Sequence, residues 1–207
     1  MPALAQSTNL GAGPFAVTAP PDSRPDDTLV RSAQSGDRSA FGLLYARYAR
    51  MVHGILLSRV PLADVDDLVQ DVFLQAMPRL HTLRDVSRFP GWLAAIARNR
   101  AIDFHRRAKF DVALDVSSVA ESDSPPSTSR HAPHGSAEAR VALEAILSLP
   151  ETYRETLILR LVEGMTGPEI AARTGLTHGS VRVNLHRGMQ QLREILAQRA
   201  PAGGGDV

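Results

Sequence analysis

The sequence predicts an all-α protein with two small helical domains joined by a flexible linker. Apolar residues recur every three or four positions in two segments, 26–110 and 136–199, as on helices with one buried face. The stretch between them, 111–135, is rich in Ser, Pro and Asp and has little apolar periodicity, which is typical of a linker. Residues 166–196 form a third signal, because they read as two helices separated by a glycine turn.

Composition excludes several classes of protein. The 207 residues include no cysteine, which rules out a disulfide framework, a thiolate metal site and a cysteine nucleophile. This composition favours a reduced, cytoplasmic setting. No signal-peptide pattern and no apolar run of roughly 18 residues is present, so we expect neither export nor membrane insertion. His131 and His134 are too isolated to form a metal site, and we predict no metal and no cofactor.

The net charge of +1 conceals an uneven distribution. Residues 28–110 carry 13 basic and 7 acidic side chains, a net of +6, whereas residues 111–137 carry 1 basic and 4 acidic ones, a net of −3. All basic residues except Lys109 are arginines, whose guanidinium groups bind phosphates and base edges in a bidentate manner. The basic segment therefore suits a polyanionic partner.

The first domain begins after a Pro-, Gly- and Ser-rich leader, 1–25, which we expect to be disordered. Asp26 or Asp27 can cap a short helix, and Asp37 can cap a longer one after a break at Gly36. Aromatic and aliphatic residues form one continuous stripe along that longer helix, which is far more typical of a core than of a ligand site.

The segment 63–77 predicts a helix with an acidic outer face. Its apolar residues share one face, while Asp64, Asp67 and Asp71 follow one another on the other at steps of three and four. The carboxylates can form a solvated face near the positive end of the helix dipole, or a docking surface for a basic partner. A Mg²⁺ site is a weaker interpretation, because no nucleophile, phosphate loop or further ligands accompany the carboxylates.

A polar loop, 79–88, precedes a basic helix at 89–109. We expect Ser87 to cap this helix. Basic and aromatic residues together on a helix suit single-stranded nucleic acid, since phosphates attract charge and unstacked bases need a flat surface. Alternatively, Trp92 belongs to the core and the arginines only increase solubility.

The second domain ends in a predicted helix-turn-helix. We expect Ser136 to cap its first helix, and residues 200–207 to form a loose tail. Thr166 and Glu169 have the spacing of a capping box, Gly175 can adopt the positive φ that ends a helix, and Thr177 can cap the next one. The second helix could enter a major groove, although an ordinary helical corner has a similar pattern.

Three stretches in this order give the chain a family resemblance: DDLVQDVFLQA, RFPGWLAAIARNRAIDFHRR and LPETYRETLILRLVEGMTGPEIAARTGLTHGSVRVNLHRGMQQLRE. The chain resembles bacterial extracytoplasmic-function (ECF) RNA polymerase sigma factors, the minimal two-domain members of the principal sigma family, over about residues 28–196. The resemblance implies a non-enzymatic subunit that binds core RNA polymerase and promoter DNA, directs duplex opening and transcription initiation, and has an anti-sigma factor as a further partner. It also implies that the acidic linker occupies the RNA exit path of the polymerase.

The resemblance assigns three sets of site residues. Polymerase binding falls to Asp64, Asp67, Gln70 and Asp71. Recognition of the melted minus-ten element falls to Arg79, Arg84, Arg88, Trp92, Arg98, Asn99, Arg100, Arg106 and Arg107. Recognition of the minus-thirty-five duplex falls to Thr177, His178, Ser180, Arg182, Asn184, His186 and Arg187.

Some features depart from the family pattern. Arg182-Val183-Asn184 stands where family members often have a basic or small polar run, so base preference cannot be transferred. Gly167-Pro168 replaces a more usual aromatic or acidic pair, and both the leader and the linker are somewhat long. A stand-alone helix-turn-helix regulator is the alternative function, but it would need neither the acidic helix nor the basic aromatic one. A nucleic-acid-processing enzyme would need clustered ligands that the sequence does not show.

Overall fold

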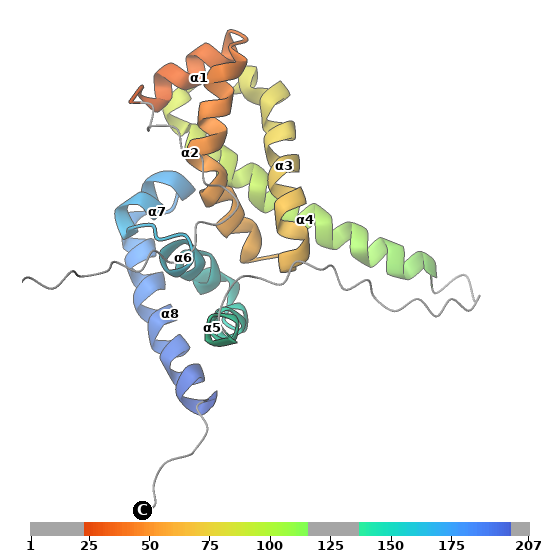
Figure 1. Cartoon of the computed structure of the whole chain (residues 1–207), viewed down its shortest axis with the longest axis vertical. Helices are drawn as coiled ribbons and strands as arrows, with labels where there is room; N and C mark the ends of the chain where they lie inside the picture. Colours follow the sequence, from red (N-terminus) through yellow and green to blue (C-terminus); the bar gives the residue numbers. More distant parts are fainter. Residues whose placement is uncertain (1–22, 116–136, 200–207) are drawn as a thin grey trace, which may run out of the picture.

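The computed structural model describes residues 23–115 and 137–199, which form helices and turns with no strand in either range (Figure 1). The prediction of an all-α protein is confirmed. Most of the predicted leader, the linker from residue 116 onward, the predicted cap at Ser136 and the tail 200–207 lie outside the described residues.

The first domain consists of α1 (Asp26–Gln34), α2 (Arg38–Leu57), α3 (Leu62–Arg79) and α4 (Phe89–Asp115). The Asp37 carboxylate caps α2 by accepting hydrogen bonds from the backbone N–H groups of Ser39 and Ala40. The predicted apolar stripe of α2 lies in the core, where the Tyr48 ring meets Phe89 edge-on at 5.3 Å. The packing confirms that this stripe belongs to the core.

Two capping predictions in this domain are wrong. Pro25 occupies the N-cap of α1, and Asp26 instead binds Arg47 and the Tyr48 hydroxyl of α2, which ties the first helix to the second. Ser87 does not cap α4, because it lies in a short 3-10 turn whose own cap is Asp85. In the first case, Asp26 binds residues of the next helix. In the second, Asp85 caps a turn that begins before α4.

The basic helix is longer than expected. α4 continues to Asp115, whereas we expected the linker to begin at residue 111. Its C-terminal part projects from the four-helix bundle in Figure 1. The Ser- and Asp-rich composition that indicated a linker therefore begins inside the helix.

The second domain consists of α5 (Ala137–Leu147), α6 (Glu151–Leu161), α7 (Gly167–Thr174) and α8 (His178–Arg199). The predicted capping box at Thr166 and Glu169 is present, and Gly175 ends α7 with a φ of 76°. The Thr177 hydroxyl accepts a hydrogen bond from the Ser180 N–H at 3.1 Å, so it caps α8. The helix-turn-helix geometry is confirmed.

The two domains are in contact, although a linker of the predicted length would allow them to lie apart. Helix α2 packs against α6, and α4 packs against α7 (Figure 1). Ion pairs from the α2–α3 turn and from α4 to α6 cross the boundary. The contact changes which of the predicted site residues are accessible.

Candidate polymerase and nucleic-acid interfaces

The exposed face of α3 carries carboxylates and apolar side chains together. Asp67 and Gln70 are exposed and Asp64 is half-buried. Asp71 accepts hydrogen bonds from the Arg100 guanidinium at 2.5 and 3.2 Å, which connects α3 to α4. Leu74 follows at the next turn with 70% of its surface exposed.

Sequence reasoning missed Leu74 and the partly exposed Met77, although their spacing from Gln70 is the four- and seven-residue step of one helix face. Large apolar groups that remain exposed beside a charged stripe are typical of an interaction surface. We define Asp64, Asp67, Gln70, Asp71 and Leu74 as the α3 stripe.

The loop before α4 presents three arginines to solvent. Arg79 is exposed at the end of α3, and Arg84 is exposed in the loop. Arg88 is also exposed, and its Nε donates to the Asp85 carboxylate at 3.1 Å. The pKa of Asp85 lies below its usual value, chiefly because the Ser87 hydroxyl donates a hydrogen bond to its carboxylate.

The candidate residues on α4 divide into two groups. Asn99, Arg106 and Arg107 are exposed, and Arg106 donates to Asp103 at 2.9 Å. Arg98 and Arg100, in contrast, already have carboxylate partners, Glu155 and Asp71 respectively. The second group cannot contact nucleic acid without releasing those partners.

Trp92 is partly buried against the core, with its ring 5.9 Å from that of Phe89. The packing favours the core interpretation of this side chain. The free aromatic surface of α4 lies instead at Phe110, which is exposed, as is Ile102. Both share a helix face with Asn99 and Arg106, a periodicity that could have revealed them in the sequence.

The recognition-helix candidates are mostly exposed. The side chains that reach solvent are those of His178, Ser180, Arg182, His186 and Arg187. Three of them, Arg182, His186 and Arg187, line a shallow hollow of about 240 Å³. The Thr177 and Ser180 hydroxyls lie 2.8 Å apart at the helix start.

Asn184, which the resemblance assigns to the minus-thirty-five duplex, is buried in the structure. Only 8% of its surface is exposed, because it faces α6 and the first domain rather than the outer side of α8. Helix periodicity placed Asn184 outside the apolar stripe of α8, but the first domain covers that position.

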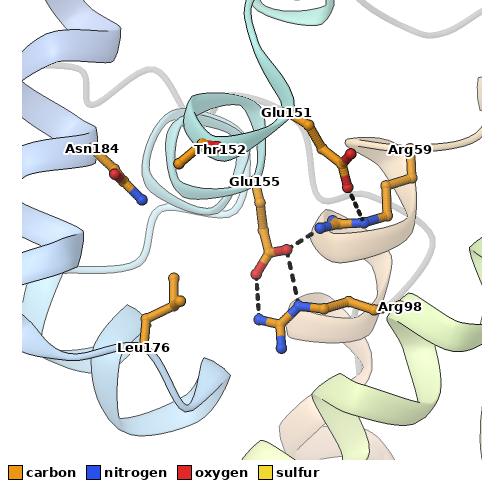
Figure 2. Close-up of a pocket in the computed structure, with 7 residues that line it drawn as sticks. All are labelled: Arg59, Arg98, Glu151, Thr152, Glu155, Leu176 and Asn184. Atoms are coloured by element: carbon orange, nitrogen blue, oxygen red, sulfur yellow. Dashed lines mark hydrogen bonds and ion pairs between the residues drawn. The ribbon is translucent and has the colours of Figure 1, made fainter.

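A polar pocket of about 230 Å³ lies between the domains. Figure 2 shows Asn184 and Leu176 on one side, Arg59 and Arg98 on the other, and Glu155 between them. Glu155 is buried, and burial alone would raise the pKa of its carboxyl. The hydrogen bonds and charge of Arg98, assisted by Arg59, outweigh burial and hold the pKa of Glu155 below its usual value.

Comparison with known proteins identifies the two domains. The sequence model of sigma-70 region 2 matches residues 44–110, and that of sigma-70 region 4 matches residues 139–192. The RNA polymerase sigma factor CarQ of Myxococcus xanthus is 34% identical over 173 residues, which cover 80% of this chain and 94% of CarQ. The ECF RNA polymerase sigma-E factor of Escherichia coli K12 is 33% identical over 177 residues, which cover 81% of this chain and 92% of that factor.

The chain belongs to the ECF sigma factors. The matched models are those of the sigma-70 family, so the expectation of the principal sigma family is corrected to sigma-70. A solved structure of CnrH in complex with the cytosolic domain of CnrY is also similar to this sigma factor. It has a TM-score of 0.57 and 29% sequence identity, and the match covers 84% of this chain and 97% of CnrH.

The site of this sigma factor is thus a set of surfaces rather than a cleft. Among the described residues, no three His, Asp or Glu side chains are grouped so that they could hold a metal ion. Within the same residues, none of the helices combines the length and apolarity needed to cross a bilayer. What the geometry offers is an acidic-apolar helix face, a basic helix with exposed apolar groups, and an arginine-bearing recognition helix.

Proposed function

We propose that this sigma factor docks on core RNA polymerase through the α3 stripe. The observation that carries the proposal is the alignment of Asp64, Asp67 and Asp71 with the exposed Leu74, on a domain whose net charge is otherwise positive. Carboxylates at the rim of such a surface steer a basic partner and fix its orientation. Burial of Leu74 would supply the apolar part of the binding free energy.

The loop and α4 are proposed to hold the melted minus-ten strand. Arg79, Arg84 and Arg88 provide positive charge at the start of α4, and Asn99, Arg106 and Arg107 provide it further along. Phe110 and Ile102 lie exposed on the same helix, where unpaired bases could stack or pack. Binding of the open strand in preference to the duplex would drive strand separation, so no residue of this chain has to make or break a covalent bond.

The recognition helix α8 is proposed to read the minus-thirty-five duplex. Its exposed Arg182, His186 and Arg187 lie on the face that a helix-turn-helix protein presents to the major groove. Ser180 and His178 lie at its N-terminal turn, the part of such a helix that reaches base edges.

Three further assignments belong to the same proposal. The acidic stretch that follows α4 in the sequence would occupy the RNA exit path of the polymerase, where its negative charge resembles nucleic acid. The protein would act in the cytoplasm, where its polymerase and DNA partners are. An anti-sigma protein would mask the binding surfaces, a proposal supported by the similarity to CnrH, which was solved bound to CnrY.

The test is co-purification of the full chain with core RNA polymerase. Asp67→Arg combined with Asp71→Arg is expected to abolish binding, because it reverses the charge of the stripe. Asp71→Arg also removes the partner of Arg100, so Asp67→Arg alone and Leu74→Ala are tested as well, and each should weaken binding.

Asp66→Arg is the matched control, since it makes the same charge change at an exposed position of α3 outside the stripe. Circular dichroism should show unchanged helicity for every variant. Retention of polymerase by the double variant, or equal loss by the Asp66→Arg control, would contradict the docking proposal.

A further inference from the structure

The contact between the domains is built around a buried carboxylate. The Glu155 side chain, on α6, is 6% exposed and receives two hydrogen bonds from Arg98 of α4, at 2.6 and 3.1 Å. Arg59, in the turn between α2 and α3, approaches the same carboxylate at 2.7 Å (Figure 2). Arg98 also donates to the Thr174 carbonyl at 3.1 Å, at the end of α7. One acidic group of the second domain thus binds two arginines of the first.

A second carboxylate repeats this arrangement just beyond the C-terminal end of α6. Glu163 is buried, and its side chain lies 3.3 Å from Arg50 Nε and 2.7 Å from His53 Nδ1, both on α2. Arg50 also donates to the Glu163 carbonyl at 2.7 Å. Helix α6 and the segment just after it are therefore both attached to the first domain by charged hydrogen bonds, which are the stronger kind.

The backbones between these two attachments lie close together. A Cβ atom on Gly54 of α2 would come within 2.8 Å of Leu159 Cδ2 and 2.9 Å of Glu163 Cγ, both from the second domain. A Cβ atom on Gly91 of α4 would lie 3.7 Å from the Gly175 Cα in the helix-turn-helix, which is an ordinary van der Waals contact. The close approach at Gly54 requires glycine, so the contact is specific in shape as well as charge.

The contact covers two residues that the family resemblance assigns to promoter DNA. Arg98 is occupied by Glu155, and Asn184 of the recognition helix is buried at the edge of the pocket. We propose that this closed arrangement is an autoinhibited form of the free chain, in which Glu155 occupies the Arg98 guanidinium in place of nucleic acid. This inference rests on the proposed function.

The physical basis is competition for the same cations. A carboxylate and a phosphate are both acceptors that the guanidinium fork binds in a bidentate manner. Polymerase and promoter bind the open form, in which α4 and α8 are separated and Arg98 is free. A protein that is open one tenth of the time loses a factor of about ten in apparent affinity, and polymerase must overcome that factor.

The test measures the distance between the domains in the full chain. Because the chain contains no cysteine, spin labels can be attached through Ala46→Cys on α2 and Ala197→Cys on α8, both exposed positions. The wild-type background should give one narrow distance distribution, and addition of core polymerase should broaden it and shift it to longer distances.

Two variants should open the free chain. Gly54→Gln places a side chain where the three nearest atoms belong to Leu159 and Glu163 of the second domain, and Glu155→Gln removes the charge that holds Arg59 and Arg98. Gly42→Gln is the matched control, since it is the same change on the same helix with open space around it. Circular dichroism establishes that each variant is folded.

Both opening variants should show long, broad distances and bind core polymerase about tenfold more tightly than the control. A broad distribution in the wild type, or a narrow one in Gly54→Gln, would overturn the closed form. Opening without any gain in affinity would overturn autoinhibition. Failure of all the proteins to bind polymerase would instead refute the proposed function, because the distance measurement is made without polymerase.

Discussion

The outward and inward faces of this sigma factor use the same residue types to different effect. Arg187 on the outer side of α8 is exposed and lines an open hollow, whereas Arg98 on the inner side of α4 is bound to Glu155. Asp67 on α3 is exposed, whereas Glu155 on α6 is buried between two arginines. Charge on a helix surface is therefore available to a partner only where the other domain leaves it uncovered.

Three kinds of position follow from this difference. Core residues determine whether a domain folds, outward residues determine what the folded protein binds, and inward residues determine how often the outward arrangement is reached. Each kind predicts a different consequence when one side chain is removed.

The core provides the largest expected effect. Phe89→Ala should lower the free energy of unfolding of the first domain by about 3–5 kcal/mol, because Phe89 is fully buried beside Tyr48 and Trp92. Denaturation followed by fluorescence of Trp92, the single tryptophan, reports this domain directly. Phe110→Ala, at an exposed position, should leave the unfolding transition unchanged. Equal shifts of the transition in the two variants would show that burial does not explain the difference expected between Phe89 and Phe110.

The outward face of α8 provides the next effect. Arg187→Ala should lose about 1–3 kcal/mol of promoter binding if its guanidinium contacts a base, and the loss should differ among promoter variants. Binding titrations of holoenzyme on duplex promoters measure it. Arg193→Ala changes an exposed arginine further along the same helix and should have a smaller, uniform effect. A uniform loss at Arg187 would indicate a phosphate contact instead.

Removal of a helix cap in the helix-turn-helix tests whether the outward face depends on local capping. Thr166→Ala removes the hydroxyl that accepts from the Glu169 N–H, and should cost about 0.5–2 kcal/mol of stability in the second domain. Thermal denaturation monitored by circular dichroism measures the change. Thr166→Ser keeps the hydroxyl and should behave like the wild type, and a matching loss in that variant would assign the effect to the methyl group.

The inward face should respond to acid. Because the pKa of Glu155 is lowered in the closed form from its ordinary value of 4.5, the contact is complete above that pH and weakens as the pH falls through the lowered value. Its charged neighbours are Arg59 in the α2–α3 turn, Arg98 on α4 and Glu151 on its own helix. Spin-label distances should therefore lengthen below pH 4.5, and Glu155→Gln should remove this dependence.

Much of the fold could be predicted because it depends on local signals. The capping box at Thr166, the positive φ at Gly175 and the buried stripe of α2 are all determined within a few residues of the chain. The prediction failed where a distant partner decides, as at Asp26, which binds Tyr48 instead of capping its helix.

The site could be predicted less completely, for the same reason. Periodicity places Asn184 and Arg98 on the polar sides of their helices, but it carries no information about a second domain packed there. Leu74 and Phe110 were missed because apolar residues were assumed to be core, although their spacing places them with exposed polar ones. Which surface each domain offers to the other depends on three-dimensional packing.

The most direct measurement is transcription in vitro with the purified chain, core RNA polymerase and genomic DNA fragments, followed by mapping of the transcript starts. The account predicts initiation at a defined set of sites that share two sequence elements, and loss of these starts with the Asp67→Arg, Asp71→Arg variant. Starts that are unchanged by addition of the chain, or that share no sequence element, would contradict it.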